Sequence, residues 1–253
     1  KLAQLQERLP ARLGGRTGIG HTRWATHGAP SDANAHPHTD GDGRFALVHN
    51  GIIENAGELR RRVEALGVEL MTETDTEALV HLIAASDAES LAGRVRQALA
   101  QAHGTYGIAV LDREAPGEIV VARNGSPVVI GLGEREMFVA SDLSALVGHT
   151  RQVVHLDDGE MAVITAKGFE TTTLHDNRPR EKSAAAVEWT SEAYERGEHR
   201  HYMRKEILDQ PQAVARTLSG RLDPRFSTSH LGGLDLDART LLGVRRVKLL
   251  GCG

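Results

Sequence analysis

The stretch HTRWATHG, residues 21–28, contains an arginine, a tryptophan and two histidines within eight positions. It lies between GIG and GAPSD, which are turn-forming sequences. Arg23 carries a planar guanidinium that can pair with a carboxylate or phosphate through two parallel hydrogen bonds. Most arginines are surface residues without such a role. The loop position and the adjacent Trp24 nevertheless favour a binding function for Arg23.

A second candidate is Asp75 in TETDTE, residues 72–77. Acidic residues in the first turn of a helix are common because they interact favourably with the helix dipole. Asp75 could also be the counter-ion of a substrate ammonium group. Together, Arg23 and Asp75 could bind the two charges of a free α-amino acid, although their spacing in the sequence does not show that they meet.

The third candidate is Asn50-Gly51 in HNGIIEN, residues 49–55. After an apolar strand, Asn-Gly most often forms a hairpin turn. The Asn side-chain amide beside an exposed Gly amide could instead form an oxyanion hole. Removal of one such donor typically costs about 3–4 kcal/mol of transition-state stabilisation.

Several histidines in the first fifty residues raise the question of a metal site. Zinc requires three or four converging ligands, but HPH at 36–38 has no helical i, i+4 partner and the single cysteine is distant. We therefore expect no catalytic metal, and structural or substrate-contacting histidines instead. The histidines concerned are His21, His27, His36, His38 and His49.

The pattern around these stretches predicts three helices. Asn55 with Glu58 is a possible N-terminal cap, and Gly67 ends that helix. Thr74 with Glu77 forms a capping-box sequence for a second helix, and a third is expected from Ser90 to His103. The apolar positions expected to face the core are Leu59, Val63 and Leu66, then Leu79, Leu82 and Ile83, and finally Leu91, Val95 and Leu99.

Beyond Tyr106 the pattern changes to short strands with tight turns, which favours antiparallel hairpins. Most of these strands are apolar throughout, so an α+β sandwich with helices beside two stacked antiparallel sheets is expected. A polar, charged segment at 175–200 reads as a linker, and Pro211 should break or kink a following helix near Gln210. The strands are YGIAVLD, EIVVAR, SPVVIGL, MFVAS, QVVHL, MAVIT and FETTTL.

The composition is that of an ordinary soluble globular protein, with 40% apolar and 25% charged residues among 253. A net charge of −4 gives no basic surface for nucleic acid, no apolar run reaches the length of a membrane span, and a lone Cys252 fits the reducing cytoplasm. The chain starts at Lys1 without a methionine and stops at RRVKLLGCG. Both ends therefore look cut, and a second domain is expected to begin near Val247.

Together, HTRWATHG, NAHPH, HNGIIEN and ETDTE resemble the glutaminase domain of the glutamine–fructose-6-phosphate aminotransferase (isomerizing) family, which are class II glutamine amidotransferases. SPVVIGLG, FVASD and HYMRKEILDQP are also similar, so the resemblance covers essentially the whole chain. It implies an N-terminal-nucleophile (Ntn) hydrolase fold, an αββα sandwich of antiparallel sheets. The implied division is a glutaminase domain lacking its N-terminal strand at 1–175, a linker with connecting helices at 176–242, and the first strand of a sugar isomerase (SIS) domain at 243–253.

The resemblance also implies a reaction. The thiol of an N-terminal cysteine attacks the glutamine amide, with its own α-amine as general base, and no cofactor takes part. Ammonia passes to fructose 6-phosphate on the isomerase half, giving glucosamine 6-phosphate in a protein expected to be a homodimer. The implied roles are the glutamine α-carboxylate for Arg23, its α-ammonium for Asp75, the pocket lining for Thr26, His27 and His36, the oxyanion hole for Asn50 and Gly51, and a gate for Trp24.

This chain departs from the family pattern at the nucleophile. Residue 1 is lysine, and the resemblance places Cys252 in the first isomerase strand with its amine in a peptide bond. We therefore expect the 253-residue chain to lack glutaminase activity. Two alternatives remain: another class II amidotransferase, such as an amidophosphoribosyltransferase, and a non-catalytic glutamine-binding or regulatory module.

Overall fold

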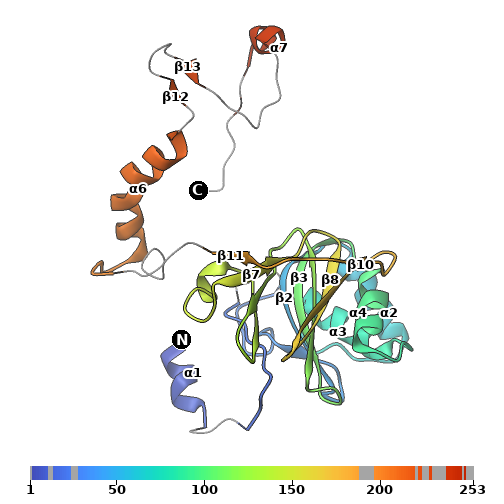
Figure 1. The fold of residues 1–253 in the computed structure, drawn as a ribbon. Coiled ribbons are helices and arrows are strands. Elements are labelled where there is room, and N and C mark those ends of the chain that lie inside the picture. Colours follow the sequence, from blue (N-terminus) through green and yellow to red (C-terminus); the bar gives the residue numbers. More distant parts are fainter. Residues whose placement is uncertain are drawn as a thin grey trace. The chain divides into compact units, whose positions relative to one another are not determined.

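The computed structural model describes the chain in two compact units, Lys1–Ala193 and Tyr194–Gly253 (Figure 1). The described residues are 2–10, 14–23, 28–187, 197–219, 222–223, 228–229, 238–246 and 248. The second unit contains helix α6 (Tyr202–Leu218), the short strands β12 (Leu222–Asp223) and β13 (Thr228–Ser229), and helix α7 (Ala238–Gly243). No helix in these described ranges is both long and apolar enough to cross a bilayer.

The first unit contains two antiparallel sheets, as the sequence predicted. The larger sheet has the strand order β1-β2-β3-β4-β8-β9-β10, and the smaller has the order β11-β7-β5-β6. Each strand expected beyond Tyr106 is present. The bounds are β1 His38–Thr39, β2 Phe45–Ile53, β3 Gly104–Asp112, β4 Glu118–Asn124, β5 Val129–Leu132, β6 Met137–Ala140, β7 Gln152–His155, β8 Glu160–Thr165, β9 Gly168–Thr173, β10 Pro179–Arg180 and β11 Ala185–Ala186.

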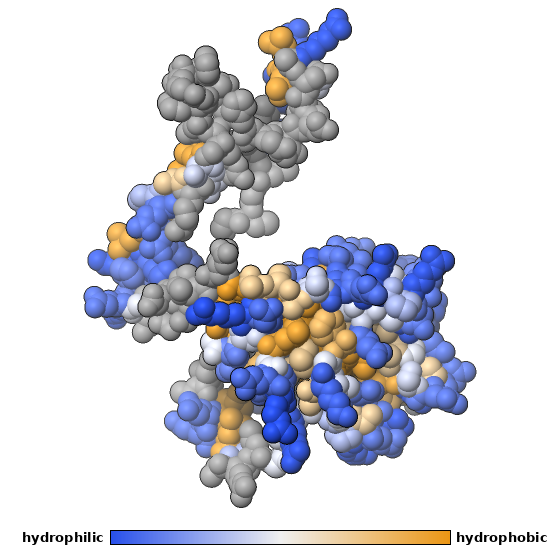
Figure 2. All heavy atoms as spheres, viewed as in Figure 1, coloured by the Kyte–Doolittle hydropathy of each residue, from blue (hydrophilic) through white to orange (hydrophobic). Residues whose placement is uncertain are grey.

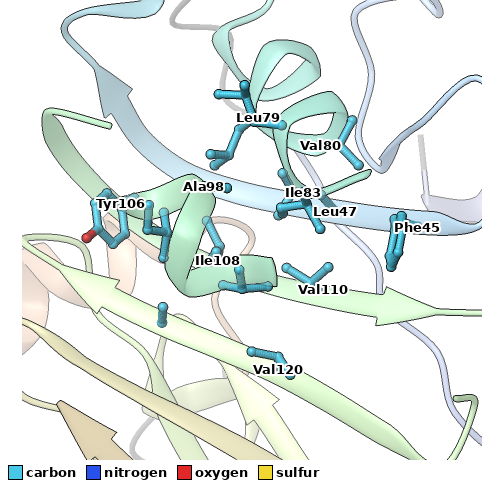
Figure 3. Packing of buried hydrophobic residues seen from close by; sticks show 14 of the residues in the cluster. Phe45, Leu47, Leu79, Val80, Ile83, Ala98, Tyr106, Ile108, Val110 and Val120 are labelled. Carbon is cyan, nitrogen blue, oxygen red and sulfur yellow. The ribbon is translucent and has the colours of Figure 1, made fainter. Parts of the chain in front are cut away.

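Three helices cover one face of the larger sheet: α2 (Ala56–Ala65), α3 (Asp75–Ala85) and α4 (Leu91–Leu99). Figure 3 shows Leu79 and Ile83 of α3 packed over Leu47 of β2, with Ile108 and Val110 of β3 beside them. α3 is buried along most of its length. Because α3 lies between other helices and the sheet, its first residue, Asp75, is buried against the sheet as well.

The other face of the larger sheet packs against the smaller sheet. Val121 and Ala162 from the larger sheet meet Ile130 and Val154 from the smaller one in a second apolar cluster. On the outer face of the smaller sheet, the described residues supply the short 3-10 helix η1 (Leu143–Ala145) and Leu146. The expected α+β sandwich of antiparallel sheets is therefore confirmed. In the described ranges, the helical layer expected on the outer face of the smaller sheet consists of η1.

The helix boundaries follow local capping. The Thr74 hydroxyl accepts a hydrogen bond from the amide of Glu77, as the capping sequence predicted, and Ser90 caps α4 in the same way. Asn55 precedes α2, but its side chain bonds to the backbone of Gln101 and His103 instead. Leu66, expected to face the core, is 60% exposed because α2 ends at Ala65.

The polar segment after residue 175 adds strands to both sheets. Arg180 pairs with Thr171 and Ala185 pairs with Val153, so the first unit continues beyond the domain boundary that the sequence suggested. Pro211 lies inside α6 and does not break it. Ile207, whose carbonyl loses its amide partner at Pro211, is 55% exposed, so water can solvate that carbonyl. The strand expected from Val247 falls outside the described residues.

Candidate functional site

Asn50 and Gly51 lie within strand β2 and not in a hairpin turn. They face Gly107 and Tyr106 of β3 in the antiparallel register. Gly51 has a φ of 128°, and a Cβ at this position would lie 2.1 Å from the carbonyl oxygen of Thr105. Only glycine allows the two strands to approach so closely here. The hairpin interpretation of Asn50-Gly51 is therefore wrong, and the pair stands within β2, where Gly51 departs from regular strand backbone.

The side chain of Asn50 is oriented by His21. The backbone N–H of Arg23 donates to His21 Nδ1 at 2.9 Å, so this nitrogen carries the lone pair. The proton of the neutral ring is then on Nε2, which lies 2.7 Å from Asn50 Oδ1. Because Oδ1 accepts this bond, the amide group Nδ2 points away from His21. Asn50 therefore presents its N–H donors to the other side.

Arg23 is half-buried and has a left-handed backbone with φ 48°. Its guanidinium donates to the carbonyl oxygens of Ala29 at 3.1 Å and Gly28 at 3.3 Å. These acceptors are neutral, and a carboxylate is a stronger partner for a guanidinium than a neutral carbonyl. The guanidinium is thus held against the backbone of Gly28 and Ala29, at the end of the 21–28 stretch.

Asp75 is 4% exposed at the start of α3. Its Oδ2 accepts from the backbone N–H of Ile53 at 2.9 Å, and its Oδ1 accepts from the Thr76 hydroxyl at 3.3 Å. His49 Nδ1 lies 3.8 Å from Oδ1. These contacts fix the orientation of the Asp75 carboxylate.

The Thr76 hydroxyl joins the histidines to Asp75. Its Oγ1 lies 3.0 Å from His36 Nε2 and 3.0 Å from His49 Nδ1, and Thr76 is fully buried. A hydroxyl has one proton and two lone pairs. Since that proton goes to Asp75, His36 donates to Oγ1 and carries its proton on Nε2. His49 faces an oxygen at each ring nitrogen, Thr76 Oγ1 at Nδ1 and the Thr105 carbonyl at Nε2, 3.5 Å away.

His36 is held neutral. Burial, the largest cause, and the nearby side chains of His21, His38, His49 and Arg23 together lower its pKa from 6.5 to about 3. Its Nδ1, which carries the lone pair in this tautomer, is buried and has no hydrogen-bond partner among the described residues. The pKa of His38 is also lowered, mainly by burial, while Arg23 lowers it and Asp75 raises it.

These contacts bring most of the described candidates into one cluster. His21 touches both Asn50 and Arg23, and its ring centroid lies 4.4 Å from that of His36. His36 continues through Thr76 to Asp75. The charges of Arg23 and Asp75 both act on His38. Three candidates lie outside the described residues, namely Trp24, Thr26 and His27.

A cavity of about 580 Å³ opens beside this cluster, between the two sheets. Asn50, His21 and His49 line one end of it, and apolar residues line the remainder, including Ile19, Val48, Ile108, Val128 and Val139. Figure 2 shows a hydrophobic area on the visible face of the first unit, between hydrophilic margins, where β7 and the larger sheet lie in Figure 1. The polar cluster therefore meets an apolar space in which a tetrahedral oxyanion could be stabilised away from bulk water.

Within the described ranges, no three histidine, cysteine, aspartate or glutamate side chains are arranged to hold a metal ion. The histidines converge instead on Thr76, Asn50 and each other.

Two functional contributions could not be read from the sequence. The sequence predicted a structural or substrate-contacting role for His21 without indicating its partner, and it indicated no role for Thr76. The signal for Thr76 was present in TDTE, where it follows a candidate ligand-binding acid, but a buried threonine at the second position of a helix is usually structural. The role of His21 depends on its contact with Asn50, which no local pattern in the sequence indicates.

The chain resembles known proteins in both sequence and structure. The family model described as a glutamine amidotransferase domain matches residues 21–148, just over half of the chain. The chain is 49% identical to the glutamine–fructose-6-phosphate aminotransferase (isomerizing) of a Thermus thermophilus strain, covering 100% of this chain and 40% of that protein. It is 47% identical to the enzyme of the same name from Symbiobacterium thermophilum, covering 95% of this chain and 39% of that protein.

Among solved structures, the fold matches the glutamine phosphoribosylpyrophosphate amidotransferase of B. subtilis with a TM-score of 0.52 and 30% identity. That match covers 64% of this chain and 35% of the other. It supports the predicted Ntn-hydrolase type of sandwich. The chain spans about two-fifths of the length of the curated relatives that it matches. All residues of the described cluster lie within the matched range, 21–148. The chain belongs to the glutamine amidotransferase domain family.

Proposed function

We propose that this chain forms the glutamine-binding and oxyanion-stabilising part of a glutamine–fructose-6-phosphate aminotransferase. The observation that carries the proposal is the Asn50 amide, which His21 orients with its N–H donors away from the imidazole. Gly51 follows it in the same strand, and the two charged candidates Arg23 and Asp75 belong to the same network. Thr26, His27, His36 and the gate residue Trp24 keep the roles that the resemblance implies.

In this proposal, Arg23 keeps its hydrogen bond to the Ala29 carbonyl and donates from its other N–H groups to the α-carboxylate of glutamine. Asp75 receives the α-ammonium, and the amide carbonyl of the substrate lies against Asn50 and Gly51. The nucleophile adds to that carbonyl carbon, and the negative charge that develops on the oxygen is stabilised by the Asn50 Nδ2 and Gly51 N–H donors. Collapse of the tetrahedral intermediate breaks its C–N bond, and the nitrogen leaves as ammonia with the proton that the general base took from the nucleophile. Water then hydrolyses the glutamyl–enzyme bond and releases glutamate.

The identity of the acceptor rests on the relatives. Two curated relatives at 49% and 47% identity carry the name of the fructose-6-phosphate enzyme. We propose that ammonia reaches fructose 6-phosphate on a sugar isomerase (SIS) half and gives glucosamine 6-phosphate, in a cytoplasmic homodimer. The proposed division of the chain is a glutaminase domain that continues past the expected boundary at 175 to include β10 and β11, a linker with connecting helices up to 242, and the isomerase start at 243–253.

Calorimetric titration with L-glutamine tests the pocket. The unsubstituted chain should bind glutamine, and Arg23→Ala and Asp75→Asn should each weaken binding at least tenfold, about 1.4 kcal/mol. The matched control is Arg62→Ala, which removes an exposed arginine paired with Glu58 in α2. Equal affinity in the chain and in Arg23→Ala would contradict the proposed pocket.

A second assay concerns the nucleophile. The only cysteine of the chain is Cys252, outside the described residues. We expect the purified 253-residue chain to release no glutamate from glutamine above the uncatalysed background. Glutamate release that disappears in Cys252→Ser would show that Cys252 is the nucleophile and would contradict this expectation.

A further inference from the structure

Asn34 and Glu73 form a reciprocal pair beside the site. The amide N–H of Glu73 donates to Asn34 Oδ1 at 3.1 Å, and Asn34 Nδ2 donates to Glu73 Oε2 at 3.2 Å. Asn34 is 4% exposed. The two residues are distant in the sequence, so this pair fastens the segment around residue 34 to the turn that precedes α3.

The pair also fixes Ala29 at both of its backbone polar groups. Asn34 Nδ2 donates to the Ala29 carbonyl at 3.1 Å, and the Ala29 N–H donates to Glu73 Oε2 at 3.3 Å. The same Ala29 carbonyl accepts from Arg23 at 3.1 Å. A single peptide position therefore connects the guanidinium of Arg23 with the carboxylate of Glu73.

The close approach depends on Gly28. This residue has a φ of 72°, and a Cβ here would lie 2.6 Å from Asn34 Nδ2 and 3.0 Å from Glu73 Oε2. The backbone after HTRWATH thus lies directly against the Asn34–Glu73 pair. A side chain at position 28 would push the two segments apart.

Glu73 stands two residues before Asp75. The Thr74 cap on α3 and the bond from the Ile53 amide to Asp75 Oδ2 fix the Asp75 carboxylate relative to this turn. The distance between the Arg23 and Asp75 charges is therefore set by the series Arg23, Ala29, Glu73 and Asp75. Asn34 braces the middle of that series.

We propose that Asn34 and Glu73 are positioning residues that set the separation of the two charged groups for a free α-amino acid. This inference rests on the proposed glutamine pocket. It identifies the residues that make the pocket selective for a free α-amino acid. An α-amino acid has a fixed distance between its ammonium and its carboxylate. A displacement of about 1 Å in a binding group can cost 10²-fold in a reaction that depends on orientation.

Substitutions that keep or remove single atoms of the pair test this proposal. Glu73→Gln retains a carbonyl oxygen at the position of Oε2, which can accept from both Ala29 N and Asn34 Nδ2. Glu73→Ala removes this oxygen. Asn34→Asp places a carboxylate against Glu73 and the Ala29 carbonyl, which produces repulsion. Glu58→Ala, at an exposed carboxylate in α2, is the matched control.

The first measurement needs no ligand. Hydrogen exchange of the Ala29 amide, followed by NMR in the intact 253-residue chain, should be at least about fivefold faster in Glu73→Ala and Asn34→Asp. It should be unchanged in Glu73→Gln and Glu58→Ala. Exchange at Ala29 that is the same in all variants would overturn the pairing itself, whether or not the chain binds glutamine.

The second measurement is the affinity for L-glutamine by calorimetry. Glu73→Ala and Asn34→Asp should bind at least about tenfold more weakly than the unsubstituted chain, and Glu73→Gln should bind within about threefold. Equal losses in Glu73→Gln and Glu73→Ala would overturn the positioning role, as would full affinity in Glu73→Ala. Failure of the unsubstituted chain to bind glutamine would instead refute the proposed function.

Discussion

His21 Nε2 lies 2.7 Å from Asn50 Oδ1, and this contact decides which end of the Asn50 amide serves as a donor. The other nitrogen of His21 accepts from the backbone of Arg23. One imidazole thus fixes both the stretch that carries the guanidinium and the amide of the proposed oxyanion hole. The two parts of the site cannot be displaced independently.

The first prediction concerns this contact. In the aminotransferase proposed above, His21→Ala should lower the kcat of glutamine hydrolysis about 10- to 100-fold with little change in KM, because it frees the Asn50 amide to rotate without removing it. Loss of a whole oxyanion donor costs about 10²–10³-fold, so Asn50→Ala should lower kcat further. Steady-state kinetics of both variants provide the check, and an unchanged kcat in His21→Ala would contradict the orienting role.

The second prediction concerns the Thr76 hydroxyl. Thr76→Val keeps the volume but removes the group that His36, His49 and Asp75 share. The free energy of unfolding should fall by about 1–3 kcal/mol, the usual cost of leaving buried polar groups unsatisfied. Urea denaturation measures it, and Thr76→Ser should recover most of the loss because it restores the hydroxyl. Similar stabilities of the Val and Ser variants would rule out the hydroxyl as the important group.

The third prediction is a pH dependence of stability. Because the pKa of His36 falls from 6.5 to about 3 on folding, the unfolded chain binds a proton between these pH values that the folded chain does not bind. The free energy of unfolding should therefore be highest above about pH 6.5 and should fall as the pH is lowered from there toward 3. His38 contributes in the same direction because burial lowers its pKa too.

Urea denaturation between pH 5 and 6.5, above the titration of most carboxylates, isolates these histidines. If the unfolded chain binds one proton more than the folded chain, the free energy of unfolding changes by at most about 1.4 kcal/mol per pH unit. His36→Asn cannot titrate and should reduce the slope of the unsubstituted chain. If the slopes in this pH range are equal, His36 is not the group responsible.

The fourth prediction concerns Gly51. Gly51→Ala should lower the free energy of unfolding by more than about 3 kcal/mol, because the new Cβ would overlap the Thr105 carbonyl of β3 and the φ of 128° is unfavourable for alanine. The control is Gly67→Ala, which also has a positive φ of 82° but no described atom within 4 Å of the added Cβ. Its cost should be limited to about 1–2 kcal/mol of backbone strain. Equal costs would show that the close strand approach is unimportant.

The sequence by itself determined the elements and the class of fold. Apolar runs separated by turn residues predicted the seven strands beyond Tyr106, and Thr74 and Ser90 marked the starts of α3 and α4, because both signals are local in the chain. It also supplied the charged and amide-bearing candidates. Local signals failed at Asn50-Gly51, where the turn propensity of the pair lost to its pairing with β3.

Tertiary structure alone decided which candidates act together and through which atoms. The bonds from His21 to Asn50, from His36 to Thr76, and from Asn34 to Glu73 join residues 29 to 40 positions apart. No periodicity reports such pairs, because they form only when the 21–39 segment lies against β2 and the start of α3. The tautomers of the histidines and the lowered pKa of His36 follow from that packing, since burial and hydrogen-bond partners determine both.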